Sequence, residues 1–198
     1  MQIENPRFVD FDAAAAAAVS SGARLIAIDG LPVAGKSTLA ERIVAATGGV
    51  GIFLDDFVRP EAEWRGKIDP SFPFGYIRYD AFLEAVSSLA AQGHCSYRPY
   101  DWATGQPSES ARTVTLDRPV VVEGVSALHP DLCPLYDLRF WVESDPASML
   151  DAALNRGVGD WAEEWRALFV PSVQLYLRGN PSARADLVVQ GRGCRETP

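Results

Sequence analysis

The residues with the clearest chemistry form a glycine-bracketed stretch at positions 30–37, GLPVAGKS. It satisfies the pattern G-x-x-x-x-G-K-[ST] at every fixed position. Glycines at these places let successive backbone N–H groups turn inward and form a nest for an anion. Lys36 then offers a mobile charge to the β- and γ-phosphates of a nucleotide, and Ser37 offers a hydroxyl to Mg²⁺. The predicted nucleotide-binding residues are Gly30, Leu31, Pro32, Val33, Ala34, Gly35, Lys36, Ser37 and Thr38.

Carboxylates follow two apolar segments that have the character of strands. Asp55 and Asp56 come directly after the segment 50–54, and Glu123 closes the run 120–122. Ligands of open parallel sheets bind at the carboxyl ends of the strands, so these side chains are expected near the phosphate loop. One of them can hold Mg²⁺, and another can accept a proton from an attacking hydroxyl. A helix cap or a surface charge is the alternative interpretation, more so for Asp56 than for Asp55.

The elements predicted around the glycine stretch would place it at the edge of a parallel sheet. An apolar strand is predicted over 24–29, a helix over 37–47 and a second strand over 50–54, which together form a βαβ unit with parallel strands. Further short strands alternate with helices along the chain. The predicted strands are 119–123, 138–142 and 186–189, with a candidate edge strand over 112–116, and the predicted helices are 79–92, 145–155 and 161–176. The fold class predicted is α/β, three layers around a mainly parallel sheet with a small lid.

The chain of 198 residues suits a single domain with local additions. Residues 1–23 are interpreted as a helical extension whose helix, 10–21, is capped by Asp10. Residues 58–78, rich in proline, glycine and aromatic side chains, are interpreted as an irregular excursion on the acceptor side, and 96–107 as a loop. Residues 156–160, which include two glycines, are interpreted as the lid.

Composition excludes several functions. Lysine and arginine number 18 against 26 aspartates and glutamates, a net charge of −8, which disfavours nucleic acid as a partner. No apolar run of about 18 residues suggests a membrane span. Three cysteines without metal-ligand spacing point to a reduced, cytoplasmic protein. A structural role is predicted for Cys95, Cys133, Cys194, His94, His129, Trp141, Trp161 and Trp165.

The ordered set of motifs resembles the uridine kinase-like family of P-loop kinases. The resemblance is carried by GLPVAGKST (30–38), LDDF (54–57), PYDW (99–102), VVVEG (120–124) and the tail over 181–189. It implies ATP and Mg²⁺ as cofactors and the transfer of the γ-phosphoryl group to a hydroxyl of a small acceptor. The family includes kinases of pyrimidine nucleosides and of ribosylnicotinamide, and relatives that act on pantothenate or ribulose phosphate.

The resemblance also assigns roles to single residues. It implies that Asp55 is the base for the acceptor hydroxyl and a candidate metal contact. Lys36 and Ser37 match the contacts to phosphate and Mg²⁺, and Glu123 matches a carboxylate that holds Mg²⁺ directly or through a water molecule. Tyr100 matches an aromatic position that contacts the nucleoside. Asp80 matches an acid that binds ribose hydroxyls, with Asp69 as a competing alignment. The remaining predicted substrate contacts are Asp56, Phe57 and Trp102, and the residues of the excursion add Trp64 and Tyr76 as aromatic faces for a ring or sugar.

The sequence departs from the family in its lid and beyond the PYD motif. The stretch 103–106 lacks the histidine with which pyrimidine-nucleoside kinases read the base, and Val58 stands where an aromatic residue is usual. The lid keeps one arginine, Arg156, predicted to stabilise charge on the transferred phosphoryl group. A helix-end cation facing the helix dipole is the alternative for Arg156. Uridine or cytidine as the acceptor is therefore not implied.

Two aspartates after the second strand repel a phosphorylated or carboxylated acceptor and favour a neutral hydroxyl compound. Nucleosides, sugars and vitamins all meet that condition. A regulatory module that binds nucleotide without turnover remains an alternative, because it keeps Lys36 and Ser37 but does not require Asp55. A GTP switch is disfavoured, since no N/T-K-x-D segment is present. The choice between ATP and GTP, and a homodimer, stay open.

Overall fold

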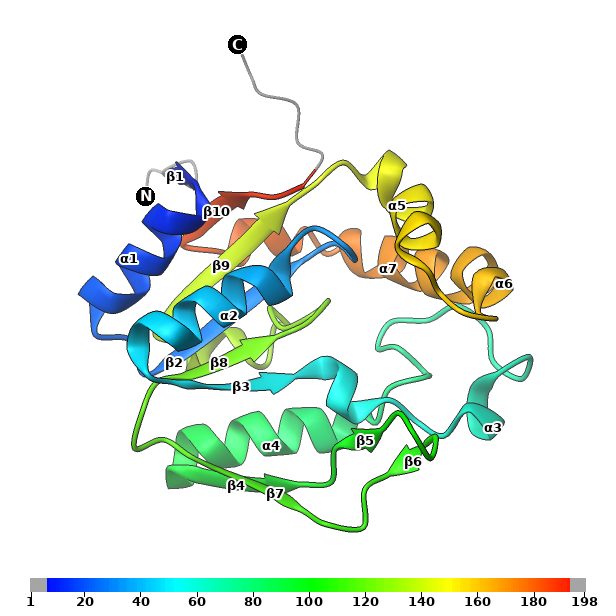
Figure 1. Cartoon of the computed structure of the whole chain (residues 1–198), viewed down its shortest axis with the longest axis horizontal. Helices are drawn as coiled ribbons and strands as arrows, with labels where there is room; N and C mark the ends of the chain where they lie inside the picture. The colour runs from blue at the N-terminus through cyan, green and yellow to red at the C-terminus, as the bar shows by residue number, and fades with distance from the viewer. Residues whose placement is uncertain (1–6, 193–198) are drawn as a thin grey trace.

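A six-stranded sheet organises the protein, whose computed structural model describes residues 7–192 (Figure 1). Every neighbouring pair of strands in it is parallel. The spatial order is β1 (Arg7–Val9), β10 (Leu187–Gln190), β9 (Leu138–Glu143), β2 (Leu25–Gly30), β8 (Val120–Glu123) and β3 (Val50–Phe53). The near-continuous apolar run of β2 fits its central place, because a parallel sheet is covered on both faces. The predicted α/β class and parallel sheet are confirmed.

Strand register brings the predicted functional segments to one edge. Glu123 is level with Ile28 on β2 and with Phe53 on β3. The loop that follows Gly30 and the 3-10 turn Leu54–Phe57 therefore leave the sheet at the same edge as Glu123. That edge is the carboxyl end of the strands, where open α/β sheets bind their ligands.

Helices cover both faces of the sheet. α1 (Phe11–Ser21) and α2 (Lys36–Thr47) pack side by side on the face nearest the viewer, and α7 (Val170–Leu177) lies behind (Figure 1). The Asp10 carboxylate accepts a hydrogen bond from the Ala13 N–H at 2.7 Å and caps α1 as predicted. α2 ends at Gly48, which takes a left-handed conformation.

A smaller antiparallel unit lies beyond β3. It consists of α4 (Tyr79–Gln92), the pair β4 (His94–Tyr97) and β7 (Arg112–Thr115), and the pair β5 (Tyr100–Asp101) and β6 (Gln106–Pro107). The strand predicted over 112–116 therefore pairs with β4 and does not join the main sheet. The predicted loop 96–107 contains three short strand segments instead. These pairings depend on contacts across the chain, which short stretches of polar residues do not reveal.

Helices flank the segment 156–160, which was predicted to be the lid. A 3-10 turn, Pro146–Ser148, leads into α5 (Met149–Arg156), and a glycine-containing loop then reaches α6 (Ala162–Glu164). A π-helical turn, Trp165–Phe169, joins α6 to α7. α3 (Glu61–Trp64), inside the excursion 58–78, lies opposite α6 (Figure 1). Two further 3-10 turns are Cys133–Leu135 and Pro181–Arg184.

Two hydrophobic cores support this arrangement. The main core runs through the sheet, α1, α2 and α4 and includes Cys95 and Cys133. A second core, formed by Trp64, Leu168 and Phe169, joins the excursion to the π-helical turn. Cys194 lies outside the described residues. Within residues 7–192, no helix combines the length and the apolar character needed to cross a membrane.

The segment predicted as a purely helical extension, 1–23, contains strand β1 as well as α1. β1 pairs with β10 and forms one edge of the main sheet. Three residues are too few for an alternating pattern to stand out, and Phe8 is 69% exposed. The strand therefore forms through its pairing partner rather than through its own sequence.

Candidate active site

The glycine stretch forms a loop between β2 and α2. Gly30 and Gly35 adopt φ angles of +146° and +109°, which side chains with a Cβ rarely tolerate. A Cβ on Gly30 would lie 2.3 Å from the Val142 carbonyl oxygen. Val33, a β-branched residue, has φ +64°, a strained conformation of the kind found at binding sites. The loop thus presents backbone, followed by the N-terminal turn of α2, as a cradle suited to phosphate.

Lys36, Ser37 and Glu123 meet at the floor of this loop. Lys36 Nζ donates to the Leu31 carbonyl at 2.9 Å and lies 3.9 Å from Glu123 Oε1. Ser37 Oγ donates to Glu123 Oε2 at 3.3 Å. Burial raises the pKa of Glu123 to about 7, although the positive charge of Lys36 opposes the rise. The carboxylate is therefore poised to exchange its proton near neutrality.

Asp55 lines the same cavity from the turn that follows β3. Its carboxyl is accessible from the cavity but surrounded by protein, and this desolvation raises its pKa. The positive charges of Lys36 and Arg156 act in the opposite direction. A carboxylate that is open to the cavity and close to cations can accept a proton from a substrate hydroxyl.

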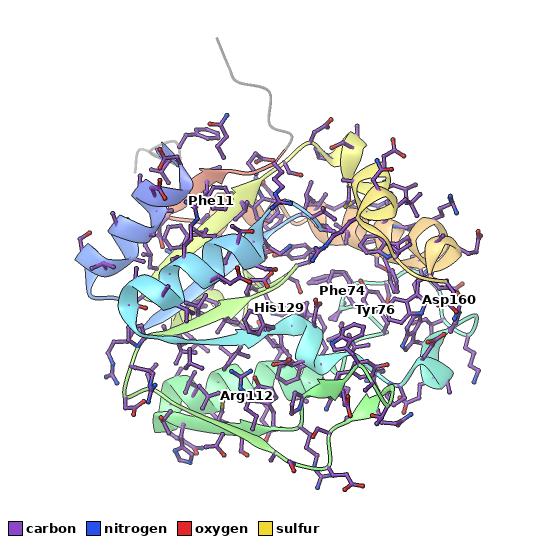
Figure 2. All side chains as sticks on the ribbon, in the orientation of Figure 1. Phe11, Phe74, Tyr76, Arg112, His129 and Asp160 are labelled. Atoms are coloured by element: carbon purple, nitrogen blue, oxygen red, sulfur yellow. The ribbon has the colours of Figure 1, made fainter. Side chains whose placement is uncertain are left out.

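A cavity of about 910 Å³ joins these groups. Its phosphate half contains the glycine loop, Asp55, Glu123 and Arg156. Its other half is aromatic, with the ring of Phe74 stacked on that of Tyr76 at 5.4 Å (Figure 2). The aromatic lining consists of Trp64, Phe74, Tyr76, Trp102, Trp161, Trp165 and Phe169. The cationic residues that line the cavity are Lys36, Arg156 and Arg192, none of which comes from the excursion 58–78.

Trp64 and Tyr76, predicted as aromatic faces for the acceptor, line the cavity, and so does Trp102. Trp102 stands at the rim, is 59% exposed, and its ring lies 6.0 Å from that of Trp161. Trp161 and Trp165, predicted to serve packing alone, also line the cavity, so that interpretation was incomplete. Helical spacing cannot distinguish a tryptophan that faces a core from one that faces a cavity.

The structure places Asp56 and Phe57 outside the cavity lining. The Asp56 carboxylate accepts a hydrogen bond from the Tyr97 hydroxyl at 2.9 Å and pairs with Arg112 at 3.4 Å. It thereby ties the turn after β3 to the β4–β7 pair. The Phe57 ring is fully buried and stacks on Tyr97 at 4.7 Å. Both residues hold the segment that carries Asp55.

Asp80 and Tyr100 also lie outside the lining. Asp80 is exposed in the first turn of α4, and the competing candidate Asp69 is exposed within the excursion. Tyr100 is buried and packs edge-to-face against Trp102 at 4.9 Å. Direct contact with an acceptor inside the cavity is therefore not expected from these residues.

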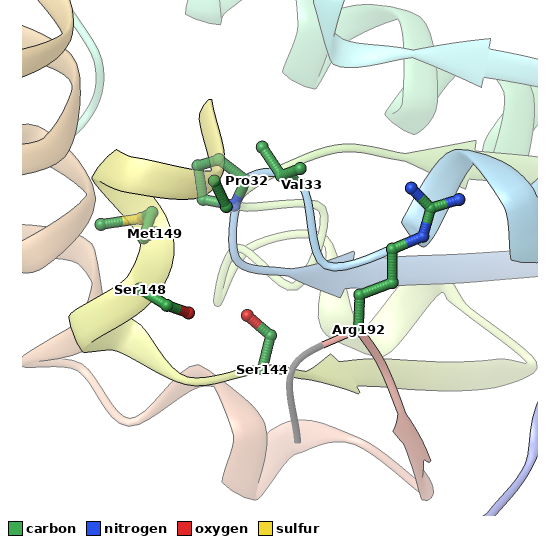
Figure 3. Close-up of a pocket in the computed structure, with 7 residues that line it drawn as sticks. Pro32, Val33, Ser144, Ser148, Met149 and Arg192 are labelled. Carbon is green, nitrogen blue, oxygen red and sulfur yellow. The ribbon is translucent and has the colours of Figure 1, made fainter. Parts of the chain in front are cut away.

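Arg192 is a cavity residue that the sequence interpretation missed. Its backbone N–H donates to the Ala34 carbonyl at 2.9 Å, which holds the segment after β10 against the glycine loop. Its side chain rises beside the loop, across a smaller pocket of about 150 Å³ from Ser148 and Met149 (Figure 3). Arg192 follows the carboxyl end of a parallel strand, so the rule that selected Asp55 and Glu123 also applied to it.

The donor set fits Mg²⁺ shared with a nucleotide. Ser37 and Glu123 provide adjacent oxygen atoms, the ligand type that Mg²⁺ prefers. Across residues 7–192 there is no group of three or more histidine, cysteine or acidic side chains arranged to hold a metal by itself. Mg²⁺ commonly takes one or two protein ligands and completes its shell with phosphate oxygens and water. The backbone cradle and these two side chains meet that requirement together.

No family model matches the sequence. Two solved structures are similar in fold. A candidate fructose transport system kinase from Silicibacter sp. TM1040 aligns with a TM-score of 0.70 and 19% identity, over 91% of this chain and 98% of its own. A candidate uridine kinase from Bacillus stearothermophilus aligns with a TM-score of 0.59 and 22% identity, over 84% of this chain and 88% of its own.

These two likenesses show that the chain shares its overall fold with both solved structures. Below 25% identity a likeness establishes architecture, and function has to be argued from the site itself.

Proposed function

We propose that the protein is an ATP- and Mg²⁺-dependent kinase of the uridine kinase type, which transfers the γ-phosphoryl group to a hydroxyl of a small neutral acceptor. The observation that carries this proposal is the presence of Asp55 in one cavity with Lys36, Ser37 and Glu123. A module that only binds nucleotide needs the last three residues but has no use for the first.

The phosphate half supplies positioning and charge. Bound Mg²⁺ would neutralise charge on the β- and γ-phosphates, with Ser37 and Glu123 holding it. The glycine loop cradles the phosphates through its N–H groups, and Lys36 contacts their outer oxygens once it leaves the Leu31 carbonyl. Arg156, at the end of α5, stabilises the charge that spreads over the transferred phosphoryl group.

Asp55 acts on the acceptor. The acceptor oxygen attacks the γ-phosphorus and forms the new O–P bond, while the bond from that phosphorus to the β–γ bridging oxygen breaks and ADP departs. The hydroxyl proton passes to the Asp55 carboxylate. Its raised pKa makes the ionised carboxylate a stronger base than an aspartate with the ordinary pKa.

The acceptor half supports a neutral compound with a ring or an apolar face. Its lining is mainly aromatic, and the excursion contributes no cation to the cavity, so an anionic acceptor would lack a partner there. Tryptophan and tyrosine rings offer flat surfaces to a nucleobase, a sugar or a heterocyclic vitamin. The buried free thiols of Cys95 and Cys133 suit a reducing compartment, and we place the protein in the cytoplasm.

The decisive experiment is an ATP-consumption screen of the purified protein over neutral nucleosides, monosaccharides and hydroxylated vitamins, beside their phosphorylated and carboxylated counterparts. Each positive compound is checked for its phosphorylated product by mass spectrometry. Turnover of a neutral compound is expected. Turnover confined to phosphorylated or carboxylated compounds would overturn the acceptor assignment, and no turnover at all with demonstrated ATP binding would favour the regulatory alternative.

A further inference from the structure

Arg65 joins the acceptor-side excursion to the lid. It stands directly after α3, and its Nε donates to Glu164 Oε1 on α6 at 2.6 Å. Its Nη1 contacts Glu61 on α3 and Asp160 Oδ2 in the lid loop, the latter at 3.1 Å. Its Nη2 donates to the Asp160 backbone carbonyl at 2.8 Å. One guanidinium thus bonds groups on both sides of the gap between the two segments, a geometry that the planar fork of arginine permits.

Aromatic contacts reinforce this link. The Trp161 ring packs edge-on against Trp64 at 5.5 Å, and its Nε1 donates to Glu61 Oε2 at 3.4 Å. Trp64 in turn packs against Phe169 at 5.5 Å within the second core. Because Trp64 and Trp161 also line the cavity, the link lies where an acceptor would bind.

A short loop connects Arg156 to this link. Only three residues separate Arg156 from Asp160, and two of them, Gly157 and Gly159, have φ angles of +93° and +59°. Such glycines give the backbone little stiffness of its own. The loop is therefore set by its two ends, which are the last turn of α5 and the contacts of Asp160 with Arg65.

We propose that Arg65 is a positioning residue, which holds the lid loop against the acceptor-binding segment and thereby keeps Arg156 directed at the phosphates. The proposal rests on the proposed function. An acceptor that settles against Trp64 and Trp161 supports the same contacts, so lid closure is favoured when acceptor and nucleotide are both present. Water is then excluded before transfer, and ATP is spared from hydrolysis.

If Arg65 had a merely structural role, its replacement would change stability and not the kinetics of transfer. Arg65 is about one-third exposed, and solvent-exposed ion pairs contribute little to global stability. The positioning role predicts that Arg65→Ala lowers kcat about tenfold, leaves the KM for ATP within about twofold, and raises acceptor-independent ATP hydrolysis relative to transfer. Arg65→Lys keeps the charge but loses the fork and is expected to restore kcat only in part.

The chain offers a matched control on α6. Glu164→Gln removes a carboxylate that Arg65 contacts, whereas Glu163→Gln changes the exposed neighbour that lies outside the contacts of Arg65. We expect Glu164→Gln to lower kcat about threefold and Glu163→Gln to leave it unchanged. Equal kinetics for the two glutamine variants, or wild-type transfer and hydrolysis in a folded Arg65→Ala, would overturn the proposal.

Hydrogen–deuterium exchange of residues 157–161 with a non-hydrolysable ATP analogue gives a readout without turnover. Faster exchange is expected in Arg65→Ala and Glu164→Gln than in wild type and Glu163→Gln; equal exchange in all four overturns the positioning role. If Arg65→Ala does not fold, Arg65→Lys and the glutamine pair decide. Wild-type protein that transfers to no acceptor yet shows the expected exchange pattern would refute the proposed function while sustaining the link.

Discussion

The two halves of the cavity are built in different ways. The phosphate half is centred on one continuous stretch, the glycine loop and the first turn of α2, which Asp55 and Glu123 join at the same edge of the sheet. The acceptor half is assembled from side chains of the excursion, the β5–β6 loop and the region from α6 to α7. The first is a local structure that a motif encodes, and the second exists only after distant segments pack together.

This difference corresponds to different chemical demands. Phosphates are the same in every nucleotide, so a rigid main-chain cradle with one lysine and one hydroxyl serves them. Acceptors vary, and specificity requires side chains whose shape and polarity can vary with them. For the phosphate half a motif therefore predicts the ligand, whereas the lining of the acceptor half indicates only the chemical character of the proposed acceptor.

The largest effect on phosphoryl transfer should come from replacing Asp55, which lies where the two halves of the cavity meet. Asp55→Asn removes the proton acceptor but leaves the glycine loop intact, so transfer should fall about 1000-fold. ATP affinity, measured by calorimetry, should stay within about threefold of wild type. Near wild-type kcat in Asp55→Asn would refute the role of Asp55 and remove the strongest argument for a kinase.

Changes confined to the phosphate half should spare acceptor binding. Lys36→Ala removes a charge that contacts phosphate, and we expect kcat/KM for ATP to fall about 10- to 100-fold. The KM for the acceptor should change less than about twofold. Unchanged ATP binding together with unchanged turnover would contradict the assignment of this half.

The pH dependence tests the electrostatics of the phosphate half. Burial raises the pKa values of both Glu123 and Asp55, that of Glu123 to about 7, and both groups act in their ionised form. Activity should therefore decline by about tenfold per pH unit as the pH falls below about 7. Saturating Mg²⁺ favours the ionised carboxylate of Glu123 and should move this decline to lower pH.

Unfolding should not cause that decline. A carboxyl group with a raised pKa binds its proton more tightly in the folded than in the unfolded protein, so protonation of these two groups below pH 7 adds to the free energy of unfolding. Melting curves recorded across the same pH range provide the control. A fall in Tm that parallels the loss of activity would contradict this explanation.

A smaller effect is expected in the acceptor half. Trp102 is exposed at the rim, so Trp102→Ala should cost little stability but raise the KM for a ring-containing acceptor about five-fold. ATP affinity should not change. Phe8→Ala, which removes an exposed ring on β1, is the control and should alter neither constant. An unchanged acceptor KM in Trp102→Ala would show that the rim does not contact the acceptor.

Sequence reasoning was most successful where the signal is local. The motif at 30–37 and the apolar strands on either side identified the phosphate loop, and the strand-end rule identified Asp55 and Glu123 as its neighbours. The same rule, applied to the last strand, would have included Arg192. In the two-stranded unit, the strand predicted over 112–116 is present as β7, but its partner over 94–97 was not predicted, because this short segment acquires strand structure only through the pairing.

The direction in which a side chain points was the second feature that sequence reasoning could not predict. Asp55 and Asp56 are adjacent in the sequence, yet Asp55 lines the cavity and Asp56 bonds Tyr97 and Arg112. Consecutive residues of a turn point in different directions, so a shared motif does not imply a shared role. For the same reason Trp161 was assigned to packing, although its ring serves both the second core and the cavity wall.

The amino-acid sequence by itself determined the parallel α/β architecture and the phosphate loop, because both follow from short-range patterns of glycine, apolar and acidic residues. Only the tertiary structure decided which aromatic rings face the cavity, which carboxylates are engaged elsewhere, and that Arg65 bridges the excursion and the lid. These facts depend on contacts between segments about 100 residues apart, such as Arg65 and Glu164, and no local pattern encodes such a contact.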